Sequence, residues 1–298
     1  MPKVSIIIPT YNSESTIERA VISCLHQTFK DIEVIVIDDG SMDSTRHIIK
    51  KIKDNRLRYY YFENSGRSKA RNRGIENARG KYIQFLDSDD TLDILKIETA
   101  MGILNSDEKI DAIQCGTRYW KENKLVVESK ASYRKNKGKL LLRQNIFPIH
   151  SVIFKKELAS SFPENLSYCE DWFFWVKTLW KANIFFQPEY FGANVFIHHE
   201  NTMTNYREMI LGEIYILLRI KKEIACKSLL RDIKIIKQFI YYLINYNKKD
   251  LHEIGESTFT RYKLLKIIYY FTDIPIIRAV LKQVFVIKNK MIKKENLY

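Results

Sequence analysis

The sequence predicts an α/β protein with a mostly parallel sheet that helices cover on both faces. Over the first ninety residues, short β-branched runs alternate with amphipathic segments, and the connections between them are short. Strand–helix–strand repetition of this kind is typical of parallel sheets, because each crossover helix packs back on the sheet. The composition agrees, since apolar residues make up 46% of the 298 residues and charged residues 28%, as in a folded globular protein.

The first strand, the first helix and the second strand are predicted from these patterns. Val4–Ile8 is a short β-branched run closed by Pro9, and Ile32–Asp38 is a second one, as expected of buried parallel strands. Between them apolar residues recur at helical spacing, and Ser13 or Ser15 can cap the start of that helix. The apolar positions are Ile17, Ala20, Val21 and Cys24 or Leu25.

The same alternation continues through the next elements. A polar helix is predicted within 43–54, a third strand over Arg58–Phe62, a helix punctuated by glycines within 65–80, and a fourth strand at the start of Lys81–Asp90. Open sheets of this kind bind ligands at the carboxyl ends of their strands. We therefore expect four strand ends to face one crevice. They are Pro9–Asn12, Asp38–Ser41, Asn64–Gly66 and Asp87–Asp90.

Later in the chain the strand pattern loosens, and one helix stands out. It is predicted over Cys169–Ala182 and is unusually rich in aromatic residues. After Thr204 the sequence is rich in Ile, Leu, Tyr and Lys and poor in glycine, which predicts helices. We expect a boundary near Asn205, between a domain of residues 1–205 and a helical region of residues 206–298. The shorter strands are predicted within 111–116, 150–156 and 193–199.

The net charge of +14 is concentrated towards the C-terminal helical region. Such a balance suits nucleic acid, anionic lipid headgroups or a phosphate-bearing substrate. In the helical region, Lys alternates with apolar residues at helical spacing. A helical bundle or dimer surface explains this pattern as well as basic helices lying on an anionic membrane leaflet do. The most apolar run, Leu264–Leu281, contains charged residues and a proline and is not expected to span a membrane.

Neither secretion nor a cysteine-based site is expected. The N-terminal apolar run is too short for a signal peptide. The cysteines are scattered without a C-x-x-C pair, which is typical of reduced thiols in a cytosolic protein. They are Cys24, Cys115, Cys169 and Cys226.

Asp87, Asp89 and Asp90 place three carboxylates within four residues at a strand end. Like charges this close repel one another, so another group must compensate them. A solvated turn, in which Asp87 or Ser88 caps the next helix, is one explanation. The placement favours Mg²⁺ or Mn²⁺, because these ions prefer oxygen ligands and bind one or two protein carboxylates together with substrate phosphates. The sequence therefore predicts a metal and diphosphate site here.

Two further groups are expected at the same edge of the sheet. Asp38–Asp39, followed by Gly40, can accept hydrogen bonds from a base or from ribose hydroxyls. A basic run around the start of the third helix is either a solvated face or, with the helix N-terminus, a phosphate site in which Arg71 balances a diphosphate. The other members of this run are Arg67, Lys69 and Arg73.

Two candidates lie later in the chain. Glu170 and Asp171 precede an aromatic run that can desolvate a carboxylate and raise its pKa towards that of a useful base. Acids at a helix start followed by core aromatics are also a common structural pattern. One of His198 and His199 can complete a metal shell or contact a phosphate, although histidine pairs are more often structural.

Four segments together resemble the family-2 glycosyltransferases with the GT-A fold. They are "SIIIPTYNSESTIERAVISCLHQTF", "EVIVIDDGSMDST", "SGRSKARNRGIENARGKYIQFLDSDD" and "YCEDWFFW". The resemblance covers Lys3 to about Thr204, in the order and spacing of the family. It implies a GT-A (Rossmann-like) sheet flanked by helices, here with a C-terminal all-helical extension. It also implies inverting transfer of a sugar from a nucleotide diphosphate to an acceptor hydroxyl.

The resemblance further implies roles for individual residues. Asp171 is expected to be the general base, with Glu170 beside it in the catalytic pair. Asp89 is expected to be the direct metal ligand, with Asp87 on the ribose or metal side and His199 as a further ligand. The expected nucleotide-sugar contacts, among which Asp39 recognises the uracil ring, are Pro9, Thr10, Tyr11, Asn12, Asp39, Gly66, Arg71, Asp87 and Ser88.

The partners implied by the resemblance are a UDP-sugar, Mn²⁺ or Mg²⁺, and a glycan or lipid-linked acceptor in surface polysaccharide synthesis. The sugar is galactose, glucose or an N-acetylated form of either. We then expect a cytoplasmic protein that is peripheral on the inner face of the cell membrane. Formation of a homodimer through the C-terminal helices is another expected role of the basic region.

Two alternative functions are weighed against the transferase. A basic nucleic-acid-binding protein is one, but the sequence has no aromatic-basic RNA-binding motif, zinc finger or helix-turn-helix signal, so no nucleic-acid partner is expected. A nucleotide-sugar pyrophosphorylase is the other, and the glycine-rich N-terminal loop of such enzymes is absent from the sequence.

Overall fold

The chain forms two compact units, Met1–Thr202 and Met203–Tyr298, which divide it near Asn205. The computed structural model describes residues 2–131, 140–198, 205–224, 228–246, 263–271 and 283.

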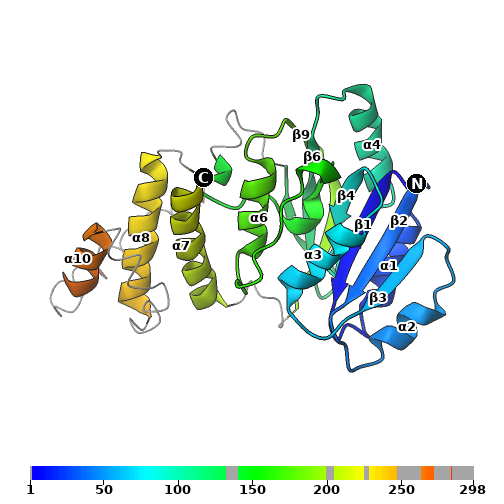
Figure 1. The fold of residues 1–298 in the computed structure, drawn as a ribbon, viewed down its shortest axis with the longest axis horizontal. Coiled ribbons are helices and arrows are strands. Elements are labelled where there is room, and N and C mark those ends of the chain that lie inside the picture. Colours follow the sequence, from blue (N-terminus) through cyan, green and yellow to red (C-terminus); the bar gives the residue numbers. More distant parts are fainter. Residues whose placement is uncertain are drawn as a thin grey trace. The chain divides into compact units, whose positions relative to one another are not determined.

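The first unit is built on one sheet (Figure 1). Its strands are β1 (Val4–Thr10), β2 (Ile32–Asp38), β3 (Leu57–Tyr61), β4 (Tyr82–Phe85), β5 (Thr91–Leu92), β6 (Ala112–Lys121), β7 (Lys124–Ser129), β8 (Val152–Lys155) and β9 (Ile184–Phe196). Across the described residues, the strands lie in the order β3-β2-β1-β4-β8-β6-β9-β5, and β7 pairs with β6. The four strands predicted in the first ninety residues are β1 to β4.

The sheet is parallel in its N-terminal half and mixed in its C-terminal half. β1 lies between β2 and β4 and is parallel to both, and β2 is parallel to β3. β8 is antiparallel to β4 and β6, and β5 is antiparallel to β9, whereas β6 and β9 are parallel. β6 and β7 form a hairpin, because Glu122 and Asn123 adopt positive φ values of 49° and 61° that suit a two-residue turn. The predicted α/β fold is confirmed.

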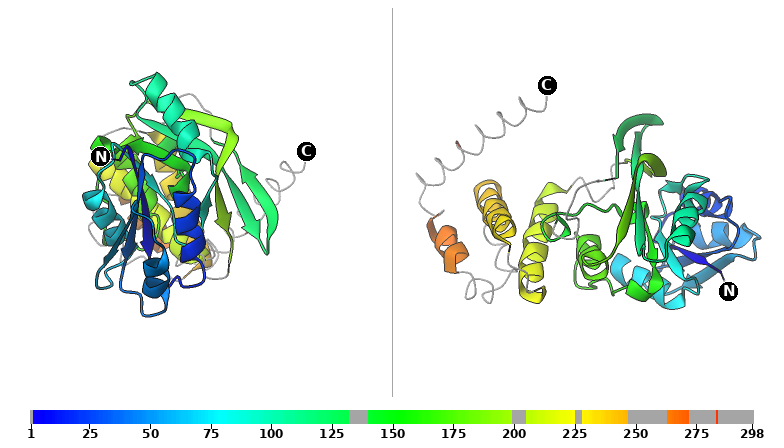
Figure 2. Two further views of the ribbon diagram at one scale, coloured as in Figure 1. Left: turned by 90° about the vertical axis from the view of Figure 1, so that its right-hand side faces the viewer. Right: turned by 90° about the horizontal axis from the view of Figure 1, so that it is seen from above.

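Helices cover both faces of the sheet. They are α1 (Ile17–Leu25), α2 (Thr45–Lys51), α3 (Arg67–Asn77), α4 (Lys96–Ser106) and α6 (Glu170–Leu179). Buried strand residues such as Ile6 and Val34 form one core cluster with residues of α1 and α4. On the other face, Gly74 of α3 packs so closely on β1 that a Cβ there would lie 2.3 Å from Ile7 Cγ2. Figure 2 (left) shows α1 and α3 on opposite sides of the strands.

Helix α1 begins at Ile17 after Thr16, so the caps predicted at Ser13 or Ser15 are wrong. The carbonyl oxygen of Ser13 accepts from the amides of Thr16 and Ile17 at 3.0 and 2.9 Å. The hydroxyl of Ser13 lies 2.9 Å from Ser88 Oγ. The Ser13 side chain is therefore directed at the loop after β4 instead of at the helix.

Helix α6 is fixed by an aromatic core. Phe174 stacks on Phe162 with ring centroids 3.9 Å apart and the planes nearly parallel. Trp172 is buried, and its Nε1 donates to the carbonyl oxygen of Leu141 at 2.7 Å. Since buried aromatic side chains contribute large apolar areas, this packing holds the first turn of α6 at a defined place.

The second unit consists of helices in its described part. They are α7 (Tyr206–Glu223), α8 (Leu229–Asn245) and α10 (Lys263–Phe271). Asn205 and Ser228 cap α7 and α8 with their side chains, and the two helices contact each other and bury residues such as Leu217 and Phe239. The predicted helical extension is confirmed. Among the helices that the structure describes, none has the length and apolar character needed to cross a membrane. Of the run Leu264–Leu281, only the part in α10 is described.

Candidate active site

The carboxyl ends of β1, β2 and β4 are joined by hydrogen bonds between the loops that follow them. The amide of Asn12, after β1, donates to Ser41 Oγ, after β2, at 2.9 Å. Ser13, also after β1, meets Ser88, after β4, through their hydroxyls at 2.9 Å. These strands are adjacent and parallel, so their ends bring the predicted loops to one edge of the sheet.

The segment that ends β1 presents an aromatic ring at this edge. Pro9 and Thr10 are buried, and Thr10 Oγ1 has no hydrogen-bond partner among the described residues. Tyr11 exposes 46% of its surface. Asn12 has a φ of 48°, which asparagine tolerates better than most residues, and its Oδ1 accepts from the amide of Met42 at 2.8 Å.

Asp38, the last residue of β2, is a structural carboxylate. It is fully buried and accepts from Tyr59 Oη at 2.6 Å and from the amide of Ser41 at 2.8 Å. The turn that follows needs Gly40, because its φ is 87° and a Cβ there would lie 2.8 Å from the backbone nitrogen of Asn64.

Asp39 is nearly as buried and holds the loop that leads into α3. It accepts from the amide and the hydroxyl of Ser65 at 3.1 Å and from the amide of Gly66 at 2.7 Å. Arg73 Nη1 lies 3.3 Å from its Oδ1. Gly66 caps α3 with a φ of 93°. In this structure Asp39 is thus bound by the protein's own donors, and its recognition of a uracil ring stays a prediction.

Asp87, the first carboxylate of the loop after β4, is paired with Arg71. Arg71 Nη2 donates to Asp87 Oδ1 at 2.7 Å. Burial raises the pKa of Asp87, but the positive charges of Arg71 and Arg67 outweigh it and hold that pKa below its usual value. Asp87 is therefore ionised, and the protein itself relieves part of the repulsion in this loop.

Asp89 lies at the surface of the same loop and faces a histidine. Its Oδ2 is 2.8 Å from His198 Nε2, and its side chain is 26% exposed. Its carbonyl oxygen accepts from Arg19 Nη2 of α1 at 2.7 Å, which fixes the backbone of the loop. His199, the predicted metal ligand, lies outside the described residues. The structure brings its neighbour His198 to the acidic loop.

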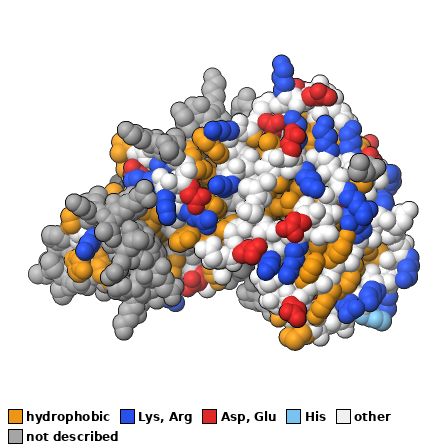
Figure 3. Space-filling model, viewed as in Figure 1, with side chains coloured by type: hydrophobic (Ala, Val, Ile, Leu, Met, Phe, Trp, Pro, Cys, Tyr) orange, Lys and Arg blue, Asp and Glu red, His pale blue; other side chains and the backbone are white. Residues whose placement is uncertain are grey.

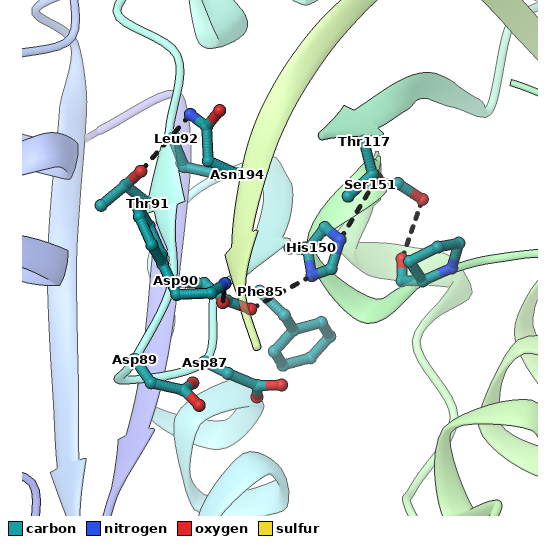
Figure 4. Close-up of polar contacts among 12 residues, drawn as sticks. Phe85, Asp87, Asp89, Asp90, Thr91, Leu92, Thr117, His150, Ser151 and Asn194 are labelled. Atoms are coloured by element: carbon teal, nitrogen blue, oxygen red, sulfur yellow. Dashed lines mark hydrogen bonds and ion pairs between the residues drawn. The ribbon is translucent and has the colours of Figure 1, made fainter. Parts of the chain in front are cut away.

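Asp90 is buried and joins the loop to two other segments. Its Oδ1 accepts from the amide of Phe196 at 3.1 Å, and its Oδ2 lies 3.5 Å from His150 Nδ1. His150 Nε2 is 3.2 Å from Thr117 Oγ1. Figure 4 shows the Asp90 side chain directed at His150, with its two neighbouring carboxylates lower on the loop. Burial raises the pKa of Asp90 well above its usual value and lowers that of His150 to about 4.

The residues at this loop fit a divalent ion that also binds a diphosphate. Among the described residues, no group of three His, Cys, Asp or Glu side chains is arranged around a common metal position. Asp89 and His198 supply one carboxylate and one imidazole, both partly exposed and 2.8 Å apart. One or two protein ligands plus substrate phosphates are the usual set for Mg²⁺, and Mn²⁺ accepts the same oxygen donors.

Asp171 stands in the first turn of α6 and is half-buried. Asn145 Nδ2 donates to its Oδ2 at 2.8 Å, and the amide of Trp172 donates to its Oδ1 at 2.8 Å. Burial, and then the charge of Glu170, raise the pKa of Asp171 to about 6. Cys169, just before the helix, has a φ of 58°, a strained conformation of the kind found at functional sites. A carboxylate with this pKa suits a general base.

Glu170 is turned to two arginines. Its Oε1 accepts from Arg71 Nη1 at 2.9 Å and lies 2.8 Å from Arg67 Nε. Glu170 exposes 3% of its surface and Arg71 exposes 2%. Arg71, predicted to contact the nucleotide, and Glu170, predicted to stand beside the base, therefore bind each other.

Sequence reasoning missed several residues that shape this site. They are Arg19, Thr117, Asn145 and His150. Each acts through a long-range contact, and only Arg19 stands within one of the segments that resemble the family. The other sequence signal is His150, a single histidine within an apolar stretch.

A parallel half-sheet with acidic loops at its strand ends, joined by Arg71 to helix α6, is the architecture of a GT-A-type fold. The chain belongs to glycosyl transferase family 2, whose family model matches residues 5–175. Membership of this family favours sugar transfer over the two alternatives, nucleic-acid binding and a nucleotide-sugar pyrophosphorylase. In Figure 3 the Lys and Arg side chains on the viewed face of the first unit are scattered among Asp and Glu.

Curated relatives and solved structures agree with the family. An uncharacterized glycosyltransferase of Rickettsia typhi is 36% identical over 202 residues, 63% of this chain and 62% of the relative. A GalNAc(5)-diNAcBac-PP-undecaprenol beta-1,3-glucosyltransferase of Campylobacter jejuni is 40% identical over 96 residues, 31% of each chain. The chain thus spans about 62% of the length of the first of these relatives.

The fold is shared with two solved structures. The structure of S. aureus TarS 1-349 in complex with UDP-GlcNAc superposes with a TM-score of 0.63 at 20% identity, covering 95% of this chain and 91% of that chain. The mannosyltransferase PcManGT of Pyrobaculum calidifontis, in complex with GDP-Man and Mn²⁺, gives a TM-score of 0.55 at 18% identity, covering 94% and 86%.

Proposed function

We propose that this chain transfers a sugar from a UDP-sugar to a hydroxyl group of a glycan or lipid-linked acceptor, with inversion at the anomeric carbon. One observation carries the proposal. The acidic loop after β4 and the helix that bears Asp171 are joined through Arg71, which supports a proposed donor site and a proposed base in one active site. The pKa of Asp171, about 6, suits removal of a proton near neutral pH.

The nucleotide is proposed to bind over the ends of β1 and β2. The exposed ring of Tyr11 offers a surface for stacking, and Asp39, which accepts from the amide of Gly66, is proposed to recognise the base. TarS was solved with UDP-GlcNAc and with UDP, which supports uridine as the base and UDP-GlcNAc as the first donor to test. PcManGT was solved with GDP-Man, so a guanosine donor belongs in the same panel.

Asp171 is proposed to act on the acceptor. As the acceptor oxygen attacks the anomeric carbon, Asp171 takes the hydroxyl proton, and the bond between that carbon and the diphosphate oxygen breaks on the opposite face. Asn145 and the amide of Trp172 orient the carboxylate for this step. One displacement inverts the anomeric configuration, so an α-linked donor gives a β-linked product. General-base assistance contributes about 10²–10⁴-fold to such reactions.

Mn²⁺ or Mg²⁺ is proposed to be held by Asp89 and His198, with Asp87 on the ribose or metal side. The complex of PcManGT with Mn²⁺ supports a divalent ion at this kind of site. A bound ion supplies positive charge to the departing diphosphate. Ser88 and the neighbouring hydroxyl of Ser13 then face the donor from the ends of β4 and β1.

A lipid-linked acceptor at the inner face of the cell membrane is proposed from two observations. The Campylobacter jejuni relative is named for a polyprenyl-diphosphate-linked acceptor. The helical region is basic and carries exposed apolar residues at the start of α8, where Leu229 is 75% exposed. Pelleting with anionic vesicles that survives high salt would support membrane docking over a dimer surface, and an unchanged supernatant fraction would refute it.

The proposal is tested with a donor panel scored by nucleotide release. We expect thermal stabilisation by UDP plus Mn²⁺ and none by oligonucleotides. We expect Asp171→Asn to abolish transfer, since it removes the base, and to leave UDP affinity nearly unchanged. Glu189→Gln, which alters an exposed carboxylate paired with Lys130, is the matched control and should retain full transfer. Equal loss of transfer and of UDP affinity in Asp171→Asn would refute its assignment as the base.

A further inference from the structure

Lys96 and Cys115 form a buried pair that takes no part in the proposed transfer. Lys96 is the first residue of α4, and Cys115 lies in β6. Lys96 Nζ donates to Cys115 Sγ at 2.9 Å, and each residue exposes 3% of its surface. The thiol in turn donates to the carbonyl oxygen of Ser151 at 3.4 Å. A nitrogen and a sulfur atom, both reactive, thus face each other in the interior of the first unit.

The position of Lys96 is unfavourable for a lysine that serves only the fold. A buried ammonium group loses its hydration, and the usual compensation is a carboxylate. Among the described residues, Lys96 forms no ion pair, and the thiol of Cys115 is the one hydrogen-bond partner of its Nζ. The first turn of a helix also disfavours a cation, because the helix dipole is positive there. Stability alone therefore does not account for the pair.

Strand β9 holds the two side chains together. Gly192 lies so close to them that a Cβ there would be 2.8 Å from Cys115 Sγ and 3.2 Å from Lys96 Cγ. The carbonyl oxygen of Gly192 accepts from the amide of Asp93 at 3.0 Å, and Tyr190 Oη donates to Asp93 Oδ1 at 2.7 Å, just before α4. These contacts fix the start of α4 against β9, so the nitrogen and the sulfur keep their separation in the folded chain.

We propose that Lys96 and Cys115 are a modification site, at which one oxygen atom taken from dioxygen joins Lys96 Nζ to Cys115 Sγ in an N–O–S bridge. A separation of 2.9 Å suits a single bridging atom, so the bridge forms without movement of α4 or β6. A direct S–N bond would require the two atoms to approach more closely. The inference is independent of the proposed function, and it differs from the sequence-based expectation of reduced thiols.

The reaction balances with dioxygen as the oxidant. One oxygen atom enters the bridge, and the other leaves as water. The ammonium loses two hydrogens and the thiol loses one; two of these three form the water, and the third is released as a proton. Sulfur and nitrogen are each oxidised by two electrons, and dioxygen is reduced by four. A dithiol such as dithiothreitol reverses the reaction by reducing the bridge to the amine, the thiol and water.

Burial selects the oxidant and limits the reaction. Thiols that are exposed to water are oxidised by peroxide and proceed to sulfinic and sulfonic acids. At 3% exposure Cys115 is shielded from such polar oxidants, whereas dioxygen is small and apolar and enters protein interiors. The neighbouring amine then captures the oxidised sulfur before further oxygen atoms are added to it.

The test is mass spectrometry of the full chain, purified in air and under nitrogen. In air we expect a mass increase of one oxygen atom less two hydrogen atoms, which dithiothreitol removes. Trypsin does not cleave after a modified lysine, so the bridge should appear as peptide 82–109 joined to peptide 110–118. Loss of two hydrogens alone would indicate a direct S–N bond, and two added oxygens on peptide 110–118 a sulfinic acid. Either one as the sole product would refute the bridge.

The variants identify the two atoms that the bridge joins. Lys96→Met and Cys115→Ala each remove one of them and should lose the cross-linked peptide. Cys24→Ser is the matched control, because Cys24 is also fully buried but lies beside Ser23, and burial raises the pKa of its thiol to about 12. It should keep the bridge at the wild-type level. Wild-type chain unfolded in urea before contact with air should form none, so the test does not depend on the folding of a variant.

The bridge should also stabilise the first unit, since it closes a loop between residues 96 and 115 as a disulfide would. We expect the wild-type Tm in air to exceed that in dithiothreitol by about 5–10 °C, and Cys115→Ala to show no difference. The proposal is overturned by absence of the cross-linked peptide in air, by equal amounts of it in folded and urea-unfolded chain, by its loss in Cys24→Ser, or by a wild-type Tm that dithiothreitol does not change.

Discussion

Two acidic loops follow strands that flank β1, and their carboxylates differ in burial and in hydrogen bonding. In the first acidic loop, Asp38–Ser41, both aspartates are buried and bound by the protein's own donors. In the second acidic loop, Asp87–Asp90, Asp89 keeps 26% of its side chain exposed and faces His198. The same residue type at equivalent strand ends thus serves as scaffold in one loop and as a candidate ligand in the other.

The difference follows from what covers each loop. Gly40 lets the segment after β3 approach the first loop closely, since a Cβ there would lie 2.8 Å from the nitrogen of Asn64. The amides of Ser65 and Gly66 then satisfy Asp39. The second loop is held through side chains and through the carbonyl oxygen of Asp89. A carboxylate held this way can exchange a partner for a metal ion, whereas one bound by several backbone amides cannot do so without opening the loop.

The largest effect that this comparison predicts is on turnover, in Asp89→Asn. The change keeps the size of the side chain and removes its charge, so the proposed metal loses its main ligand. We expect turnover to fall about 100-fold or more, since metal-based charge stabilisation contributes several kcal/mol, and the Mn²⁺ concentration needed for half-maximal turnover to rise. Thermal stability should change little because the side chain is partly exposed. Full turnover in this variant would show that the second loop is scaffold too.

The second prediction concerns the pH dependence of turnover, which we expect to follow the titration of Asp171 and not that of either acidic loop. Asp171 has to be ionised to accept a proton, and its pKa is raised to about 6. Turnover should therefore increase as pH rises through 6 and fall about tenfold for each pH unit below it. The measurement is the pH profile of kcat in wild type and in Asp38→Asn, which should share the same limb. A shifted limb in Asp38→Asn would mean that the first loop contributes to the titration of the base.

The third prediction concerns stability, through the same Asp38→Asn variant. In Asp38→Asn the remaining oxygen can accept from the amide of Ser41, but the NH₂ group then faces Tyr59 Oη, which must turn to accept, and the negative charge that both donors bind is lost. Losing hydrogen bonds to a buried charged group costs about 1.5–3 kcal/mol. We expect that decrease in the free energy of unfolding, measured by urea denaturation, while Asp89→Asn serves as the exposed comparison. Equal stability of the two variants would remove the distinction between the loops.

The sequence predicted the parallel half of the sheet and the place of both loops, because β-branched runs, helical spacing and strand-end polar residues are local signals. It did not predict how the carboxylates are bound. Asn145, His150 and Arg19 reach the site through contacts that no local pattern encodes. The motifs supplied the residue types, and packing decided which of them remain accessible.

The histidine pair shows the same limit. A shift of one residue in the register of a strand turns every side chain to the other face, and His198 follows β9, which ends at Phe196, by two residues. The residue that meets the acidic loop therefore depends on the register of β9, which Asp90 helps to set by accepting from the amide of Phe196. That hydrogen bond joins residues more than a hundred positions apart, so a motif match cannot supply it.

The smallest expected effect is that of Thr117→Val, which tests how the buried end of the second loop is held. The variant removes the hydroxyl that lies 3.2 Å from His150 Nε2 and keeps the shape of the side chain. We expect a loss of about 1 kcal/mol in the free energy of unfolding. Turnover should stay close to that of the wild type, because Asp90 still accepts from the amide of Phe196 and the position of Asp89 does not change.

Thr28→Val is the control, since the Thr28 hydroxyl makes an exposed hydrogen bond to Glu98 and its loss should leave both stability and turnover unchanged. If Thr117→Val lowered turnover as strongly as Asp89→Asn, the accessible carboxylate would depend on its buried contacts as completely as Asp38 does. The second loop would then be scaffold throughout, and the accessibility of Asp89 alone could not distinguish it from the first loop.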